Sequence, residues 1–255
     1  MTAPQQSAKT TYLLRLGDTA LVLSQRMSEL CGKGPALEED MAMANTALDL
    51  LGHARLWLSY AAEIEDAGRD EDALAYLRND REFHNFLLVE QPNGNYADTM
   101  VREFFFDAWH TLALSLLMRS ADERIAEIAA KSQKEVKYHL RRSGDLIVRM
   151  GDGTEQSHML TQRAVNVLWP FTGEMFASDQ VDRDMSSSGE GFDPSLLRDD
   201  WLEYIGKVFD VATLETPRPD AWMQTGGKQG LHTEHLGFLL AEMQVVHRAH
   251  PGAKW

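Results

Sequence analysis

Apolar residues recur every three or four positions along most of the chain, which is the spacing of one face of an α-helix. No segment shows the every-second-residue alternation that is typical of a half-buried β-strand. Long helices joined by short connections favour an antiparallel bundle of about four core helices with extra helices around it. The predicted helices cover Tyr12–Cys31, Leu37–Asp66, Glu71–Arg78, Arg81–Val89, Ala97–Arg119, Ala121–Met150, Thr154–Ala177 with a kink at Pro170, Pro194–Glu215 and Leu231–His247.

Three of these helices carry more apolar surface than a single stripe provides. The helix over 37–66 is apolar around most of its circumference, which indicates a central position in the bundle. The helices over 12–31 and 97–119 have a second apolar face, and in the latter Phe104–Phe106 and Trp109 spread over more than one side. We expect another chain to cover part of the surplus faces on these last two helices.

Composition and charge limit the kinds of partner and location that this chain can have. The 255 residues are 44% hydrophobic and 25% charged, enough for one well-packed domain over residues 12–255, after a disordered tail over residues 1–11. A net charge of −14 disfavours nucleic acid and anionic membranes as partners. No apolar run approaches the roughly 18 residues of a membrane span. The single cysteine, Cys31, excludes an internal disulfide and indicates a cytoplasmic protein.

Helix bundles of this size often hold two metal ions, which need a carboxylate from each of two helices and a Glu-x-x-His pair from each of two others. Two of the predicted helices, over 37–66 and 121–150, each carry an acid–histidine pair that is one residue wider than the Glu-x-x-His spacing. His139 follows Glu135 by four positions, and the position three before it is Val136. Asp49 and His53 are again four apart. Each acid–histidine pair could share an ion or form a hydrogen bond, and the stripe with Asp49 and His53 faces either solvent or a polar interior.

One pair does have ligand spacing, namely Asp107 and His110, with Glu103 one turn before them. These three residues form either half of a metal site or a face for a partner. The helix over 12–31 has no carboxylate on its best apolar stripe. The sequence therefore predicts a degenerate di-metal site without bound metal. The alternative is a di-iron or di-manganese oxidase in its own right, with Glu103, Asp107, His110, Glu135 and His139 as ligands.

Two features near the C-terminus have both a chemical and a structural interpretation. The segment Gly226–Gly230 precedes a helix, so its N–H groups and Lys228 could hold one phosphate or carboxylate, or it forms a flexible turn. His232 and His235 could bind a metal ion, but no further ligand is identifiable, which favours a surface or capping role.

Six blocks stand out along the chain: LRLGDTALVLSQRMSELCG (14–32), ANTALDLLGHARLWLSYAAE (44–63), NFLLVEQPNGNYADT (85–99), FFFDAWH (104–110), KEVKYHLRRSGDLIVRMGDGT (134–154) and TGGKQGLHTEHLGFLLAEMQ (225–244). They resemble the C subunits of phenylacetyl-CoA epoxidases, which are bacterial multicomponent monooxygenases. The resemblance runs from about residue 12 to the C-terminus, and it is specific because several of the blocks are long and unusual.

The resemblance implies a ferritin-like fold and a non-catalytic structural role. In such complexes a homologous A subunit holds the di-iron centre and inserts oxygen from O2, with electrons that a reductase subunit takes from NADPH. The product is a ring 1,2-epoxide of phenylacetyl-CoA. The C subunit has no cofactor of its own, stabilises the A subunit and lines part of the pocket for the CoA thioester.

By position along the chain, the resemblance also implies substrate contacts in this protein. A competing interpretation is that residues 82–85 only begin a short amphipathic helix. A third class of function, ferritin-type storage, would require a self-assembling shell. The implied contact residues are Glu82, Phe83, His84 and Asn85, and more weakly Arg183, Asp184 and Met185.

Overall fold

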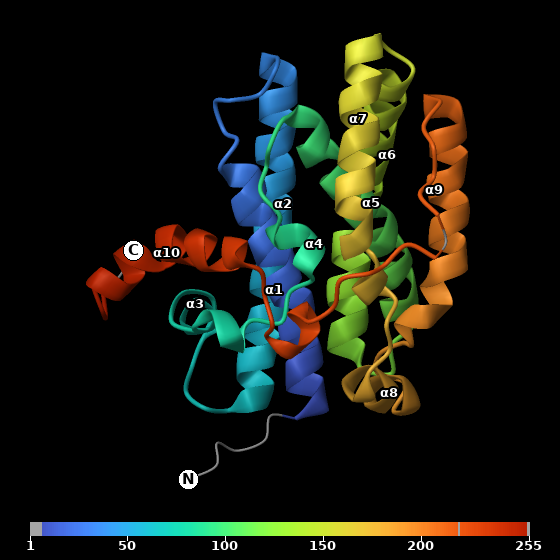
Figure 1. The fold of residues 1–255 in the computed structure, drawn as a ribbon. Helices are drawn as coiled ribbons and strands as arrows, with labels where there is room; N and C mark the ends of the chain where they lie inside the picture. The colour runs from blue at the N-terminus through green and yellow to red at the C-terminus, as the bar shows by residue number, and fades with distance from the viewer. Residues whose placement is uncertain (1–6, 219, 254–255) are drawn as a thin grey trace.

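Two antiparallel helix pairs make up the core of the ferritin-like, all-α bundle (Figure 1). The computed structural model describes residues 7–218 and 220–253, and those residues contain no β-strand. In the first pair α1 packs on α2, and in the second α5 packs on α6, with α7 and α9 beside it. The α-helices are α1 (Ala8–Ser28), α2 (Leu37–Glu65), α3 (Glu71–Tyr76), α4 (Leu87–Glu90), α5 (Tyr96–Leu117), α6 (Glu123–Gly151), α7 (Glu155–Leu168), α8 (Gln180–Ser187), α9 (Arg198–Ala212) and α10 (Glu234–Ala249).

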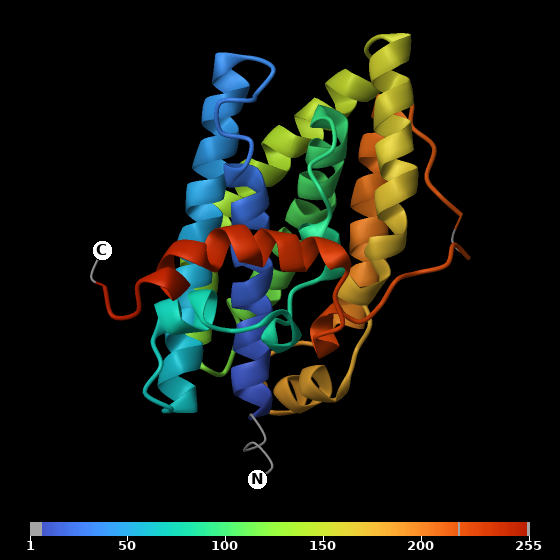
Figure 2. The same cartoon turned by 60° about the vertical axis from the view of Figure 1, so that its left-hand side comes forward.

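Short 3₁₀ turns connect several of these helices, at Asp80–Glu82, Trp169–Phe171, Gly173–Met175, Pro194–Leu197 and Gly227–Gln229. The C-terminal helix α10 crosses the first pair and packs on α3 and α1 (Figure 2). Helices α4 and α8 also pack against α1, and Arg15 of α1 donates to the Lys228 carbonyl in the 227–229 turn at 3.4 Å.

The surplus apolar faces of α1 and α5 are covered by this chain itself. Leu21 and Val22 on α1 are buried, because α4, α8 and α10 lie against that helix as well as α2. On α5, Phe104 and Phe105 are fully buried among α6, α7 and α9, and Phe105 packs against Trp201 at a centroid distance of 5.6 Å. The prediction that a second chain covers these two helices is therefore wrong.

The apolar surface that this chain leaves uncovered lies instead on α2. Leu37, Met41 and Leu48 are 71%, 58% and 65% exposed, at helical spacing on one face. The predicted central position of this helix is therefore wrong, since only part of its circumference packs against α1, α3 and α6. An exposed apolar stripe of this kind is typical of a surface that another molecule covers.

The segment predicted as one helix over 81–89 is interrupted, because residues 83–86 are not helical. After the Asp80–Glu82 turn, the backbone N–H groups of His84, Phe86 and Leu87 donate to side chains of other segments rather than to carbonyls one turn back. Their acceptors are Asp18, Thr19 and Glu174. Buried N–H groups need partners, and here tertiary acceptors replace the helical ones. The α-helical part is α4 at Leu87–Glu90, and the Asp80–Glu82 turn is 3₁₀.

The segment predicted as a loop over 179–193 contains α8. Asp179 caps this helix by accepting from the N–H of Asp182, whose carboxylate accepts from the N–H of Asp179 in return. This capping box supplies partners for the first N–H groups of a short helix. Farther along, Pro194 begins a 3₁₀ turn capped by Asp193, and α9 follows from Arg198.

Other boundaries differ by smaller amounts. The first helix begins at Ala8, capped by Ser7, so the predicted tail extends too far, and residues 1–6 of it lie outside the described residues. The predicted helix over 154–177 ends as α7 at Leu168, where Pro170 brings in 3₁₀ turns rather than a kinked continuation. The last helix begins at Glu234, three residues after the predicted start.

Candidate functional site: a metal-like polar interior and the segments beside α1

All seven candidates for a degenerate metal site gather between α2, α5 and α6. Glu103, Asp107 and His110 of α5 are at most 4% exposed, so they face the interior rather than a partner. The stripe on α2 also lines the interior at His53, which is 2% exposed. We call this group the polar interior; it consists of Asp49, His53, Glu103, Asp107, His110, Glu135 and His139, together with Arg142.

The two acid–histidine pairs of α2 and α6 are exchanged between the helices. His53 on α2 forms a hydrogen bond with Glu135 on α6, with Nε2 and Oε2 2.7 Å apart. His139 on α6 forms the reciprocal bond with Asp49 on α2, with Nε2 and Oδ2 2.9 Å apart. Each carboxylate is thus bound by the histidine of the opposite helix. The pairs act as cross-links between α2 and α6.

A cation lies against the carboxylate of α5. The Arg142 guanidinium donates to Glu103 at 3.2 Å and to Glu39 at 2.9 Å. Glu39 also accepts from the Tyr96 hydroxyl at 3.0 Å. Glu103 is fully buried, so its negative charge is compensated by an arginine that reaches in from α6.

Burial sets the protonation of the remaining groups on α5. Burial and then the charge of Glu103 raise the pKa of Asp107 well above its ordinary value, which favours the neutral acid. The hydroxyl of Ser143 donates to Asp107 at 2.8 Å. Burial, followed by the positive charges of His53 and His139, holds the pKa of His110 well below its ordinary value. Both shifts thus favour the uncharged form of the group.

The two cross-linking histidines differ from each other. Burial lowers the pKa of His53 despite its bond to Glu135. Burial also lowers that of His139, but the hydrogen bond to Asp49 and the charges of Asp107 and Glu103 raise its pKa on balance. The pKa values of the two cross-linking histidines are therefore shifted in opposite directions.

These donors do not fit the ligand set of a carboxylate-bridged di-metal centre. Such a centre needs carboxylates from four helices, and the carboxylate of Asp18 on α1 instead binds Arg78, away from the polar interior. Arg142 places a fixed positive charge against Glu103, where a ligand would have to bind cations. Among residues 7–218 and 220–253, no group of three or more His, Cys, Asp or Glu residues is arranged to hold a metal ion.

The first of the two segments predicted to contact substrate, residues 82–85, is only partly accessible. Glu82 is exposed and caps the Asn79 N–H at 2.8 Å, and His84 is half-buried. Phe83 is buried beneath the Arg78 guanidinium, 4.3 Å from its ring centroid. Asn85 is fully buried and its amide donates to Glu90 and to the carbonyl of Phe86, so its donors are occupied within the chain.

The second segment lies on α8. Arg183 and Asp184 are exposed, and each contacts the side chain of Gln180 one turn earlier. Met185 is 2% exposed and faces the core. The polar members of both segments, namely Glu82, His84, Arg183 and Asp184, are therefore those that can reach a ligand.

The loop Gly226–Gly230 lies between these two segments and is well packed rather than flexible. Its Lys228 is 5% exposed and forms an ion pair with Asp182 of α8. The carbonyl of Lys228 accepts from His84 Nδ1 at 3.2 Å. A Cβ at Gly227 would overlap the carbonyl oxygen of Asn85, so this close approach requires glycine.

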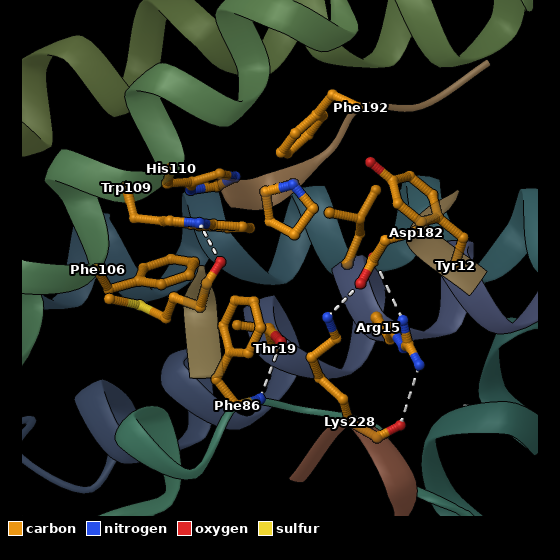
Figure 3. A pocket seen from close by; sticks show the side chains of 13 residues that line it. Tyr12, Arg15, Thr19, Phe86, Phe106, Trp109, His110, Asp182, Phe192 and Lys228 are labelled. Atoms are coloured by element: carbon orange, nitrogen blue, oxygen red, sulfur yellow. Dashed lines mark hydrogen bonds and ion pairs between the residues drawn. The ribbon is translucent and has the colours of Figure 1, made fainter. Parts of the chain in front are cut away.

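A small cavity adjoins this loop and reaches the polar interior (Figure 3). Its volume is about 30 Å³, the space of a single water molecule. Phe86, Trp109 and Phe192 line it, and His110 of the polar interior forms part of its wall. A CoA thioester is far larger than this cavity.

His232 is neither on the surface nor paired with His235. Its side chain is 3% exposed and bonds to Glu90 Oε2 at 2.8 Å and to the Phe83 carbonyl at 2.9 Å. The prediction of a surface or capping role is wrong for this residue. Glu90 is fully buried and also accepts from the N–H and hydroxyl of Thr233 at 2.7 Å.

The sequence interpretation missed several buried charges that organise this region. Glu90 ends an apolar run, and an acid in that position is a usable signal of a buried polar contact. Glu174 accepts from the N–H groups of Leu87, Gly226 and Gly227, and no local pattern marks it. Arg142 resembles any solvent-facing arginine of an amphipathic helix.

No helix in the described part of the chain is long and apolar enough to cross a membrane. The family model described as "Phenylacetic acid catabolic protein" matches residues 1–255. Among curated proteins, the C subunit of the 1,2-phenylacetyl-CoA epoxidase of Escherichia coli (strain K12) is 52% identical over 246 residues. The match covers 96% of this chain and 98% of that protein.

Proposed function

Because the chain belongs to the phenylacetic acid catabolic protein family, we propose that it is the structural, non-catalytic member of a phenylacetyl-CoA 1,2-epoxidase complex. In this proposal it acts in aerobic phenylacetate catabolism, in the cytoplasm. It stabilises a homologous A subunit that holds the di-iron centre. A reductase subunit supplies that centre with electrons from NADPH, and O2 provides the oxygen atom.

The observation that carries the non-catalytic role is the position of Arg142. Its guanidinium bonds to Glu103 at 3.2 Å and compensates a fully buried carboxylate. A di-metal centre requires such carboxylates to face cations, and an arginine in that place supplies the positive charge instead. The exchanged pairs of His53 with Glu135 and of His139 with Asp49 occupy further donors in cross-links between helices.

A role as a partner subunit is supported by the exposed face of α2. Leu37, Met41 and Leu48 form an apolar stripe that this chain leaves uncovered. Apolar side chains at the centre of an interface contribute much of the free energy of association. We assign this stripe to contact with the A subunit.

A contribution to the CoA-thioester pocket is supported by the exposed polar residues on the two segments beside α1. His84 and Arg183 carry N–H groups that can bond to phosphate or amide oxygens of CoA. Glu82 and Asp184 are exposed beside them. The buried residues Phe83, Asn85 and Met185 support the backbone of these segments.

Co-expression with the candidate A subunit tests the proposal. We expect the two chains to purify together, with about two iron ions in each A subunit and none above background in this chain. Turnover of phenylacetyl-CoA should require both chains and a reductase. This chain alone, carrying about two iron ions and converting phenylacetyl-CoA without the A subunit, would refute the structural role.

One observation favours the alternative, a metal oxidase in its own right. Asp107 Oδ1 and His110 Nδ1 are buried without a hydrogen-bond partner among the described residues, and they have ligand spacing. The alternative predicts that Asp107→Ala and His139→Ala remove metal and activity together. On the structural role, both variants lower stability or association with the A subunit and leave the iron content of the complex unchanged.

A further inference from the structure

The two segments assigned to the CoA-thioester pocket come from distant parts of the chain. One segment is 82–85, after α3, and the other is 183–185, on α8. The loop 226–230 separates them. Its central residue, Lys228, bonds to His84 of the first segment and to Asp182, which comes just before the second.

The side chain of Lys228 is bound to the α8 side. Its ammonium group donates to the Ala177 carbonyl at 2.7 Å and forms an ion pair with Asp182, which lies one residue before Arg183. Arg15 of α1 holds the same helix, with bonds of 2.6 Å to Asp179 and 3.3 Å to Asp182. The N-terminal turn of α8 is therefore fixed by two cations.

The main chain of Lys228 is bound to the other segment. Its carbonyl accepts from His84 Nδ1 at 3.2 Å and from Arg15 Nη2 at 3.4 Å. One residue thus connects His84 through its backbone and α8 through its side chain. Figure 3 shows the Asp182 side chain between those of Lys228 and Arg15, with a dashed line to each.

The loop itself is anchored, so it can transmit this constraint. Glu174 accepts from the N–H groups of Gly226 and Gly227 at 3.3 and 3.1 Å. Gly230 has a φ of +74°, and a Cβ there would overlap the Arg81 carbonyl oxygen. The loop therefore packs directly against the backbone of Arg81, just before the first segment.

Because the charges of Lys228 and Asp182 are buried, the arrangement in which α8 stays against the 226–230 loop is favoured. The side chains of Lys228 and Asp182 are 5% and 6% exposed. A buried ion pair tolerates little displacement, because separating its members leaves desolvated charges uncompensated. Movement of α8 away from the loop is accordingly costly.

We propose that Lys228 is a positioning residue that fixes the spacing between the two CoA-contacting segments, 82–85 and 183–185. This inference rests on the proposed function, and it adds a residue that touches neither the thioester nor the iron. With the segments held in place beforehand, the ligand does not have to order them on binding. Loss of Lys228 reduces the population of the binding-competent arrangement and weakens binding in proportion.

Steady-state kinetics of the complex with the A subunit and reductase test the inference. In Lys228→Met we expect KM for phenylacetyl-CoA to rise about tenfold, if the competent arrangement falls to about a tenth of the population, while kcat stays near the wild-type value. Lys228→Arg restores a cation that can bond to Asp182 and should recover most of the affinity. Lys207→Met, an exposed lysine of α9, is the matched control and should leave both constants unchanged.

Hydrogen exchange of the complex without substrate gives an independent measurement. Lys228→Met should raise amide exchange both in α8 and around His84, whereas Lys207→Met should raise neither. If Lys228→Met does not fold, Lys228→Met/Asp182→Asn removes both charges of the pair, and Arg15 keeps its ion pair with Asp179. We expect this double variant to fold and to show the same rise in KM.

The possible failures are distinguishable. An unchanged KM in Lys228→Met, or in the double variant, refutes the inference while the wild-type complex still turns over phenylacetyl-CoA. A fall in kcat with unchanged KM assigns Lys228 only to stability and also refutes it. If the wild-type chain neither assembles with the A subunit nor supports turnover, the proposed function fails and the inference fails with it.

Discussion

The ion pair between Arg142 and Glu103 provides the sharpest test of the polar interior. Arg142→Met keeps the aliphatic part of the side chain and removes the charge. Glu103 is fully buried, so the variant leaves a carboxylate with no cation in contact. The bond to Glu39 is lost as well, but Glu39 is 26% exposed and water can replace that partner at small cost.

The expected loss follows from the pKa of Glu103. Burial already raises this pKa above its ordinary value of 4.5, with Arg142 opposing the rise. Without Arg142, Glu103 avoids a buried charge in the folded protein by binding a proton. Holding that proton costs about 1.4 kcal/mol for each pH unit above the ordinary pKa of a glutamate. Wild type already bears part of this cost, because its own Glu103 pKa is raised. The loss on mutation is therefore at most about 3 kcal/mol at pH 7 and at most about 1 kcal/mol at pH 5, given the ordinary pKa of 4.5.

The sign of the pH dependence is part of the prediction. A carboxyl whose pKa is higher in the folded than in the unfolded state makes the protein less stable as pH rises. Arg142→Met should therefore lose more stability, relative to wild type, at pH 7 than at pH 5. In Arg142→Met/Glu103→Gln no charge is left to bury, so most of the stability should return and the added slope should vanish.

Urea unfolding followed by circular dichroism measures these free energies at several pH values. Lys137→Met removes an exposed cation from the same helix and should change stability by less than about 0.5 kcal/mol. A loss below about 1 kcal/mol at pH 7 in Arg142→Met would contradict the reasoning. So would a double variant as unstable as the single one.

Three further predictions concern other parts of the molecule. Asp18→Ala leaves the buried Arg78 cation without its carboxylate and should lower the free energy of unfolding in urea by about 3–5 kcal/mol, whereas a loss under about 1 kcal/mol would contradict the pairing. Burial raises the pKa of Glu174 to about 7, so wild type should lose on the order of 3 kcal/mol of stability as pH rises from about 4.5 to 7, and Glu174→Gln should lack this slope in urea titrations. Met41→Ser and Leu48→Ser on the exposed face of α2 should change stability by less than about 0.5 kcal/mol but reduce co-purification with the A subunit, and undiminished co-purification would move the interface elsewhere.

Much of the polar interior was predictable from helical spacing. Histidines and carboxylates that share a helix face can meet across a bundle, and the candidate residues do lie in one place. Spacing did not decide the partners, because Glu135 could reach His139 on its own helix or His53 on α2. The distance between α2 and α6 decides in favour of the exchange, with both bonds under 3.0 Å.

The region around Lys228 was less predictable. Glycines at 226, 227 and 230 indicate a turn, but they equally permit a mobile loop or an anion site. Buried carboxylates from distant segments resolve this choice, since Glu174 and Asp182 bind the loop backbone and the lysine side chain. A single sequence does not show which acids and bases become neighbours.

Local patterns in the chain were enough to predict the all-α class and most of the long helices, because helical periodicity and caps act between residues at most four positions apart. Other features depend on contacts between distant segments. Residues 83–86 are not helical because side chains from distant segments bind the N–H groups here: Asp18 accepts from His84, Thr19 from Phe86 and Glu174 from Leu87. Likewise, the second apolar faces of α1 and α5 are buried by helices that lie far away in the sequence. Such contacts form only when distant segments meet in the folded chain, so the helical propensity of a local segment does not predict them.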